Sequence, residues 1–276
     1  MDSIKTTQHV TGGGQTGRRD NGALVVVTGA GGGIGLSIVR RLRRDGWSVM
    51  ATDRDEAALD TVLAEFSGDV ALHTAPMDVA RREDIDRIAV LCARQGAGVA
   101  GLVNVAGLLQ DVVPLLKMDD AMQRRVWDVN YFGAGNCIQA FAPMMAAIGG
   151  GAIVNITSIN EIRPLPLHAY APSKVALGAL TTLAAGDLGP QGIRVNAVAP
   201  GFTLTPIFRD KLDSGKRDAG TIKSHTALGR LVETDEIAAA VSFLVGDESS
   251  AITGVSLPVD GGWLAASHWM NFRELA

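Results

Sequence analysis

A cluster of glycines directly after a short apolar segment is the feature that most constrains how this chain can fold. Residues 24–27 read Leu-Val-Val-Val, and residues 28–35 read Thr-Gly-Ala-Gly-Gly-Gly-Ile-Gly. Apolar residues then recur at helical spacing from Ile34 to Leu42, so the sequence predicts a buried strand, a tight turn and a helix. Glycine lets the backbone approach a ligand closely, and the N–H groups at a helix start favour an anion. A pyrophosphate group is therefore the expected ligand of this turn.

An acidic residue follows the next predicted strand. Asp53 ends the apolar run that begins at Val49. At this place in a dinucleotide-binding unit, a carboxylate accepts hydrogen bonds from the adenosine ribose hydroxyls and repels a 2′-phosphate. We therefore expect NAD(H) rather than NADP(H), although Arg54 opposes that preference by partly neutralising the carboxylate.

The length and composition favour one α/β domain. The chain has 276 residues, of which 47% are hydrophobic, so it can bury a sizeable core. Residues 1–21 are polar and glycine-rich, which predicts a flexible tail before a single folded domain over residues 22–276. The net charge is −4 and the basic residues are scattered, so we expect no nucleic-acid partner. The longest apolar runs are too short to span a membrane.

The cysteines indicate neither a metal site nor disulfide bonds. Cys92 and Cys137 lie within predicted helices and lack metal-ligand spacing. The first residues contain no apolar segment of the kind found in secretory signals. We therefore expect reduced thiols, no bound metal and a cytoplasmic location.

Seven apolar segments separated mostly by helical patterns predict a doubly wound, Rossmann-like parallel sheet flanked by helices. Pro258 cannot donate to a strand ladder, so the last strand should lie at a sheet edge. A long helical stretch is expected over 119–148, interrupted at Gly133, Gly135 and Pro143. The predicted strands are 24–27, 47–52, 70–74, 99–105, 152–157, 193–198 and 252–259.

Polar residues follow several of these strands, at the edge where ligands of such sheets bind. Ser158 follows the fifth strand, and residues 104–107 and 200–205 follow the fourth and sixth. Between the fifth and sixth strands lie Tyr170 and Lys174, four residues apart and hence on one face of a helix. Pro172 is tolerated only in a first helical turn, which places the helix start close to Tyr170.

The tyrosine and lysine are suited to proton transfer. A phenol has a pKa near about 10, and an adjacent ammonium together with an oxidised nicotinamide would favour the phenolate. Tyr170 would then take the proton from a substrate hydroxyl while a hydride leaves the same carbon. Ser158 would hold the substrate oxygen, and Lys174 would also reach the nicotinamide ribose.

These motifs resemble those of the short-chain dehydrogenase/reductase family in its single-domain form. Residues 28–35 match the family's TGxxxGxG element, and Tyr170 to Lys174 match its YxxxK. Asn130 matches the asparagine of its long helix, so the resemblance implies a catalytic set of Asn130, Ser158, Tyr170 and Lys174, in which the asparagine holds a proton-relaying water. The resemblance spans about residues 23–263.

The resemblance and the site arguments together predict the NAD contacts. Asp78 resembles the family's aspartate beside the adenine, with a helix cap as the alternative, and Thr203 and Thr205 resemble positions that contact the carboxamide and the phosphate. The predicted cofactor-binding residues are Gly29, Gly33, Ile34, Gly35, Asp53, Arg54, Asp78, Val79, Asn104, Ala106, Gly107, Tyr170, Lys174, Pro200, Gly201, Thr203 and Thr205.

The sequence departs from the family pattern in two places. The usual NNAG reads Asn-Val-Ala-Gly at residues 104–107, which removes the hydrogen bond of the second asparagine. The gap between Ser158 and Tyr170 is one residue shorter than the commonest spacing, which implies a shorter loop on the substrate side. Asn104 and Gly107 remain, so we expect the chemistry to be retained.

The loop over residues 158–166 resembles that of sugar-oxidising family members such as glucose 1-dehydrogenases. Its polar side chains favour a sugar, polyol or cyclic diol as substrate. The alternative for Glu161 is a surface ion pair with Arg163. His168 is expected to line the substrate site or to be solvated rather than to act as a second base. The candidate substrate contacts are Gln110, Asn160, Glu161, His168 and Phe202.

Two further segments are expected to border the site. Residues 206–228 are rich in charge and glycine and predict a mobile lid over the substrate. The tail 263–276 is too apolar for free solvent and predicts packing against a second copy of the chain, so a homo-oligomer, either a tetramer or a dimer, is expected.

Two other kinds of function remain open. An NADPH-linked 3-oxoacyl or other carbonyl reductase, or a hydroxysteroid dehydrogenase, would share the fold. The first of these would have a basic residue without a carboxylate after the second strand and a basic patch for an acidic carrier protein. A dinucleotide-sensing regulatory protein would keep the fold with a broken catalytic set, whereas all four residues are present here.

Overall fold

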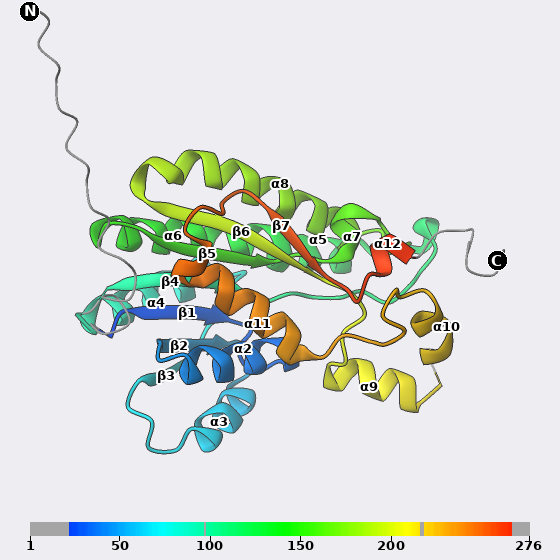
Figure 1. Cartoon of the computed structure of the whole chain (residues 1–276), viewed down its shortest axis with the longest axis horizontal. Helices are drawn as coiled ribbons and strands as arrows, with labels where there is room; N and C mark the ends of the chain where they lie inside the picture. The colour runs from blue at the N-terminus through cyan, green and yellow to red at the C-terminus, as the bar shows by residue number, and fades with distance from the viewer. Residues whose placement is uncertain (1–21, 97, 216–217, 267–276) are drawn as a thin grey trace, which may run out of the picture.

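The computed structural model describes residues 22–96, 98–215 and 218–266. These residues form a seven-stranded, all-parallel sheet in the order β3-β2-β1-β4-β5-β6-β7 (Figure 1). The strand order reverses between β1 and β4, which is where such sheets bind nucleotides. The strands are β1 (Leu24–Thr28), β2 (Ser48–Asp53), β3 (Leu72–Pro76), β4 (Val99–Asn104), β5 (Gly151–Ile156), β6 (Ile193–Pro200) and β7 (Ser256–Val259).

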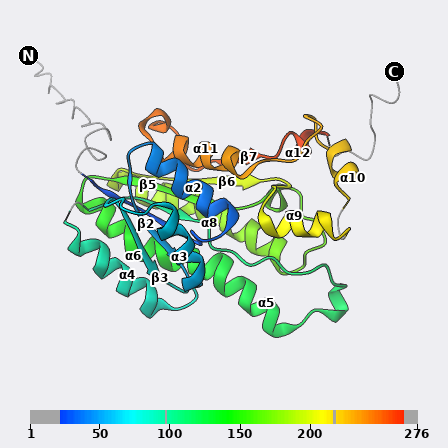
Figure 2. The same cartoon turned by 90° about the horizontal axis from the view of Figure 1, so that it is seen from below.

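Helices cover both faces of the sheet (Figure 2). One apolar core joins the sheet to α2 (Gly33–Arg44), α3 (Glu56–Glu65) and α11 (Thr234–Val245). A second core joins the opposite face to α4 (Arg82–Arg94), α6 (Ala134–Ala147) and α8 (Tyr170–Leu188). Because both faces are buried, the central strands are continuous apolar runs rather than alternating ones, as the fully buried β1 shows.

Shorter elements complete the described chain. They are η1 (Leu115–Lys117), α5 (Asp120–Trp127), η2 (Asp128–Gly133), α7 (Ile159–Ile162), η3 (Gly189–Gln191), α9 (Pro206–Asp213), α10 (Ala219–Ser224), η4 (Asp247–Ser249) and α12 (Trp263–Ala266). The segment expected to be a lid contains α9 and α10, and Figure 1 shows both beyond the carboxyl ends of the strands. Within the described ranges, every helix is too short or too polar to cross a lipid bilayer.

The predicted doubly wound parallel sheet is confirmed, and its details differ at three places. β3 begins two residues later than expected, because Val70 is 91% exposed. β7 is only four residues long, and it lies at the edge beside β6 as Pro258 predicted. The long helix continues through Gly135 and Pro143, and its interruption is the π-helical turn η2, which ends at Gly133, as predicted, and holds Asn130.

Candidate active site

The glycine turn between β1 and α2 is shaped by close backbone approach. Gly29 has a φ of +64°, and a Cβ there would lie 2.8 Å from the Ala106 backbone. A Cβ on Gly35 would lie 2.0 Å from the carbonyl oxygen of Gly29. The helix start at Gly32 has no side-chain cap, so its N–H groups are available to an anion. The turn therefore fits the pyrophosphate of a dinucleotide.

Asp53 closes this turn from the end of β2. Its Oδ2 accepts a hydrogen bond from the Gly31 N–H at 3.0 Å, and its Oδ1 accepts one from Asp55 at 3.1 Å. Arg54 is exposed, whereas Asp53 is half-buried. The carboxylate is therefore held at the mouth of the turn, where the sequence predicts that the adenosine ribose of the cofactor binds.

The loop after β4, residues 104–107, lies against the glycine turn. Thr28 Oγ1 accepts hydrogen bonds from the N–H groups of Val105 and Ala106, both at 3.1 Å. Asn104 donates to Asn155 Oδ1 at 2.8 Å and so ties β4 to β5. These bonds fix the 104–107 loop against the glycine turn although Val105 replaces the family's second asparagine.

Asp78 has protein partners of its own. Its Oδ1 accepts from the Ala80 N–H at 2.9 Å, and its Oδ2 pairs with Arg125 at 3.1 Å. The neighbouring Val79 is buried against Gly133, where an added Cβ would lie 2.7 Å from Val79 Cγ2. A turn-forming role for Asp78 is thus observed, and its contact with adenine stays a prediction.

The loop after β6 returns to the glycine turn. Thr205 caps α9 by accepting from the Phe208 N–H at 3.2 Å, and Thr203 donates to the carbonyl of Gly201 at 3.1 Å. A Cβ on Gly33 would lie 2.6 Å from Pro206 Cδ and 3.3 Å from Thr205 Cβ. The Pro200–Thr205 segment and the start of α2 therefore face the same space, as cofactor binding by both requires.

Tyr170 and Lys174 lie on one face of α8, as their spacing predicts. The Lys174 ammonium is 5.6 Å from the centre of the Tyr170 ring and donates to the carbonyl of Ile156, at the end of β5, at 2.7 Å. The Ser158 hydroxyl lies close enough to the Tyr170 phenol to lower its pKa. The structure thus brings serine, tyrosine and lysine together at the carboxyl end of β5.

Asn130 reaches the same place from the π-helical turn. Its Oδ1 accepts from the Leu108 N–H at 2.7 Å, and its Nδ2 donates to the Leu108 carbonyl at 3.1 Å and to Ser173 Oγ at 3.0 Å. A Cβ on Gly107 would lie 3.4 Å from Asn130 Oδ1 and 3.5 Å from Lys174 Nζ. Asn130 and Lys174 therefore both approach Gly107, so the asparagine lies next to the lysine of the Tyr170–Lys174 pair.

Burial dominates the acid–base properties of this cluster. It raises the pKa of Tyr170, and the nearby Ser158 hydroxyl opposes that rise. It lowers the pKa of Lys174 to about 8, and the charge of Glu161 opposes that fall. Within the described residues, burial therefore outweighs Ser158 and holds the pKa of Tyr170 above its usual value. The expected phenolate, for which the sequence argument also required an oxidised nicotinamide, stays a prediction.

Three predicted substrate contacts have structural partners instead. Gln110 Oε1 accepts from the N–H groups of Ala169 and Tyr170 at 2.5 and 2.9 Å and so caps α8. Asn160 donates to Ser158 Oγ at 3.0 Å and accepts from the Leu165 N–H at 2.9 Å. Glu161 accepts from Ser256 Oγ at 2.8 Å, which neither expected alternative anticipated. Their contact with substrate stays a prediction.

The two remaining candidates are His168 and Phe202. His168 is half-buried two residues before Tyr170. Phe202 packs edge-on against Trp263, with ring centres 5.8 Å apart, and the Arg163 guanidinium lies 5.5 Å from the centre of the Trp263 ring. Trp263, expected to cover a second copy of the chain, is thus buried within its own chain, whereas residues 267–276 of that tail lie outside the described residues.

Ser173 is a buried site residue that the sequence argument missed. Its Oγ accepts from Asn130 and donates to the Tyr170 carbonyl at 2.7 Å, which links the π-helical turn to the start of α8. The residue lies inside the YxxxK motif and is fully buried. Its position directly before Lys174 is the signal that could have drawn attention to it.

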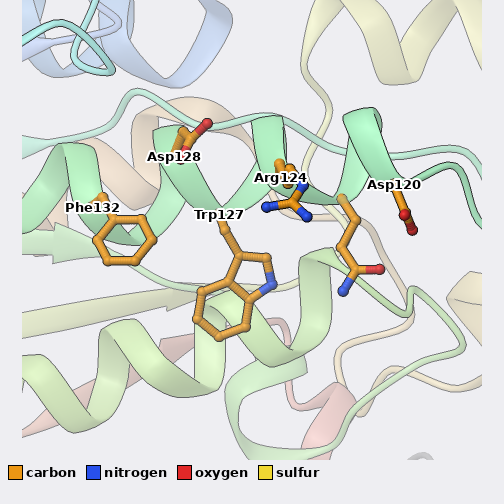
Figure 3. A pocket seen from close by; sticks show the side chains of 6 residues that line it. Asp120, Arg124, Trp127, Asp128 and Phe132 are labelled. Carbon is orange, nitrogen blue, oxygen red and sulfur yellow. The ribbon is translucent and has the colours of Figure 1, made fainter.

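A separate surface pocket lies along α5 (Figure 3). Arg124, Trp127 and Phe132 line it together with the acidic side chains of Asp120 and Asp128. Its volume is about 330 Å³. None of its lining residues belongs to the four-residue cluster, so this pocket is distinct from the candidate active site.

The chain is similar to known proteins over most of its length. A family model described as enoyl-(acyl carrier protein) reductase matches residues 29–264. Galactitol 2-dehydrogenase (L-tagatose-forming) of Cereibacter sphaeroides is 38% identical over 89% of this chain and 96% of its own length. The 2,5-dichloro-2,5-cyclohexadiene-1,4-diol dehydrogenase of Sphingobium indicum is 33% identical over 89% of this chain and 98% of its own length.

Solved structures share the fold closely. One called ribose-5-phosphate isomerase, from Brucella melitensis 16M, is 39% identical with a TM-score of 0.85 and covers 90% of this chain and 95% of that one. NAD+-bound xylitol dehydrogenase is 31% identical with a TM-score of 0.83 and covers 88% and 99%. ElxO with NADP bound is 28% identical with a TM-score of 0.84 and also covers 88% and 99%. Similar chains therefore carry either nicotinamide dinucleotide.

Proposed function

The chain belongs to the short-chain dehydrogenase/reductase family, and on that premise we propose that it oxidises a secondary alcohol with NAD+. The observation that carries the proposal is the cluster of Ser158, Tyr170 and Lys174 beside the glycine turn. It joins an oxygen-binding hydroxyl, a proton-accepting phenol and a buried cation at the strand ends where this fold binds dinucleotides.

Each side chain has a distinct task in this proposal. Ser158 and Tyr170 hydrogen-bond the substrate oxygen, and the phenol oxygen of Tyr170 takes its proton during oxidation and returns one during reduction. Lys174 stabilises the phenolate and holds the nicotinamide ribose, while Asn130 holds a water that connects Lys174 to solvent. A bound nicotinamide supplies the hydride acceptor.

The choice of NAD+ over NADP+ depends on Asp53. Its carboxylate is held at the mouth of the turn by the Gly31 N–H and is suited to accept from the ribose hydroxyls. A 2′-phosphate at the same place would meet that negative charge. Arg54 is exposed, so water and salt screen its charge. We therefore do not expect it to reverse the preference for NAD+.

A polyol, sugar or cyclic diol is the proposed substrate class, and the product would be a ketone or lactone. The support is twofold: relatives are named for galactitol and for a cyclohexadiene diol, and the loop after Ser158 is polar. Ser158 and Tyr170 bind one hydroxyl of the substrate. Its other hydroxyls would contact the half-buried His168 and the segment around Phe202.

The test is a panel assay of NADH and NADPH absorbance with polyols, sugars, cyclic diols, hydroxysteroids and 3-hydroxyacyl thioesters. We expect turnover with NAD+ and a polyol or cyclic diol. Preference for NADP+ and the acyl thioester would instead favour the carbonyl-reductase alternative, and a chain that binds NADH without any turnover would favour a dinucleotide sensor.

Tyr170→Phe is the decisive variant for the assigned chemistry. Loss of the phenol oxygen should lower kcat/KM by about 10²- to 10⁴-fold, the usual contribution of a general acid–base group. NADH binding, followed by fluorescence titration, should change little, because the ring remains. Turnover that survives in this variant would refute the role of Tyr170.

We also propose that the chain forms a homo-oligomer, a dimer or a tetramer, through the face of α5, η2 and α8. Phe132 of η2 is 53% exposed, Leu183 of α8 is 72% exposed, and both α5 and η2 pack against α8. Covering such apolar side chains with a second copy would remove them from water. Light scattering should give a multiple of 28.8 kDa, and Phe132→Glu should reduce it.

A further inference from the structure

The carboxyl group of Glu161 lies in the seam between α7, α8 and β7. Its Oε2 accepts a hydrogen bond from Ser256 Oγ, on the edge strand, at 2.8 Å. On the other side it lies directly against α8, because a Cβ added to Gly178 would be 2.2 Å from Oε1 and 2.8 Å from Cγ. The carboxylate thus occupies the space that a side chain at position 178 would need.

This seam places a negative charge one helical turn from Lys174. Gly178 follows Lys174 by four residues, so the two share a face of α8, and Glu161 lies against that face. Lys174 is only 3% exposed, and its Nζ donates to the Ile156 carbonyl. A buried ammonium with neutral partners alone would tend to lose its proton.

The other groups around Lys174 do not supply a counter-charge. Tyr170, on its own helix, presents a neutral ring 5.6 Å away, and Asn130 of the π-helical turn and the Gly107 loop are uncharged. Among the described residues, Glu161 is the carboxylate whose charge acts on Lys174. It opposes the effect of burial, which brings the pKa of Lys174 down to about 8.

We propose that Glu161 is a positioning residue that provides the counter-charge of Lys174 and keeps it an ammonium beside Tyr170. Glu161 then acts through Lys174 rather than by holding substrate hydroxyls. The requirement for glycine at position 178 follows from the same arrangement. This inference rests on the proposed function for its catalytic consequence, whereas its physical content, the charge state of Lys174, does not require turnover.

The direct test is an NMR titration of the lysine side chains in the free protein. The chain has six lysines, and the ¹³Cε signal of Lys174 is identified by its disappearance in Lys174→Met. The wild-type signal should titrate with a midpoint at a pH of about 8. Glu161→Gln keeps the shape of the side chain and an oxygen for Ser256 but removes the charge. We expect it to lower the midpoint by roughly 0.5 to 1 on the pH scale.

Ser256→Ala is the matched control, because it removes the hydrogen bond to Glu161 and keeps the charge. Its midpoint should stay at the wild-type value. The proposal is overturned if Glu161→Gln leaves the midpoint unchanged or raises it, or if Ser256→Ala lowers it equally. Should Glu161→Gln fail to fold, Gly178→Ala carries the same test: its methyl group displaces the carboxylate from α8, and an unchanged midpoint would overturn the proposal.

The activity readout is the pH profile of kcat/KM for alcohol oxidation. If Lys174 loses its proton at a lower pH in Glu161→Gln, the alkaline limb of the profile should move to lower pH by the same amount. A merely structural role would lower activity at every pH without moving that limb. An enzyme that oxidises none of the alcohols would refute the proposed function and leave the NMR result fully interpretable.

Discussion

The two halves of the sheet's carboxyl edge are built by different means. Around β1 and β2 the site is made of backbone: Gly29 and Gly35 approach other main-chain atoms so closely that no side chain fits. Around β5 and α8 it is made of side chains that distant segments hold in place, such as Asn130 from η2 and Gln110 from the loop after β4. In the proposed function, the first half binds the dinucleotide, and the second supplies the side chains for proton transfer.

This difference determines how each half should respond to substitution. In the glycine half, the main chain leaves no space for a side chain, so even an added methyl group should strongly weaken cofactor binding. In the side-chain half, the catalytic groups are held by hydrogen bonds, so loss of one partner should weaken their positioning in steps that depend on those bonds. The predictions below test that contrast, from the largest expected effect to the smallest.

Gly35→Ala should have the largest effect in the glycine half. Its methyl group would lie 2.0 Å from the Gly29 carbonyl oxygen, so the turn must open. At about 3 kcal/mol for such overpacking, NADH binding measured by fluorescence titration should weaken about 100-fold. Gly135→Ala is the matched control, because its methyl group would meet only Leu180 Cδ2 at an ordinary 3.7 Å. Equal NADH affinity in the two variants would remove the contrast between the halves.

The same contrast explains what could be predicted from the sequence. The glycine turn, the parallel sheet and the shared face of Tyr170 and Lys174 depend on local patterns, and the structure has all three. The partners of Gln110 and Glu161 do not, because they lie 59 to 60 and 95 residues away along the chain. A polar side chain near a catalytic serine looks like a substrate contact until the fold shows which backbone or side chain it meets.

Asp53→Asn tests the side-chain contribution within the glycine half. An asparagine keeps an oxygen for the Gly31 N–H but loses the charge that should repel a 2′-phosphate. At about 1.5 kcal/mol for a hydrogen bond to a charged group, the ratio of kcat/KM for NAD+ over NADP+ should fall about 10-fold. Asp55→Asn is the control, because Asp55 caps α3 and either side chain can do so. A ratio that is unchanged in Asp53→Asn would place cofactor choice elsewhere.

Gln110→Leu should have the smallest effect and act on the other half. Leucine removes the cap that Oε1 provides to Ala169 and Tyr170, so the first turn of α8 loses its acceptor and the phenol its fixed position. A lost helix cap costs about 1 kcal/mol, which lowers Tm by about 2–4 °C in a protein of this size. We expect kcat to fall a few-fold while the Kd for NADH stays unchanged, because the glycine turn is untouched. Gln110→Glu retains an acceptor and should recover most of the kcat. If both variants instead raised KM for the alcohol with kcat unchanged, Gln110 would be a substrate contact, and the two halves of the edge would differ less than their geometry indicates.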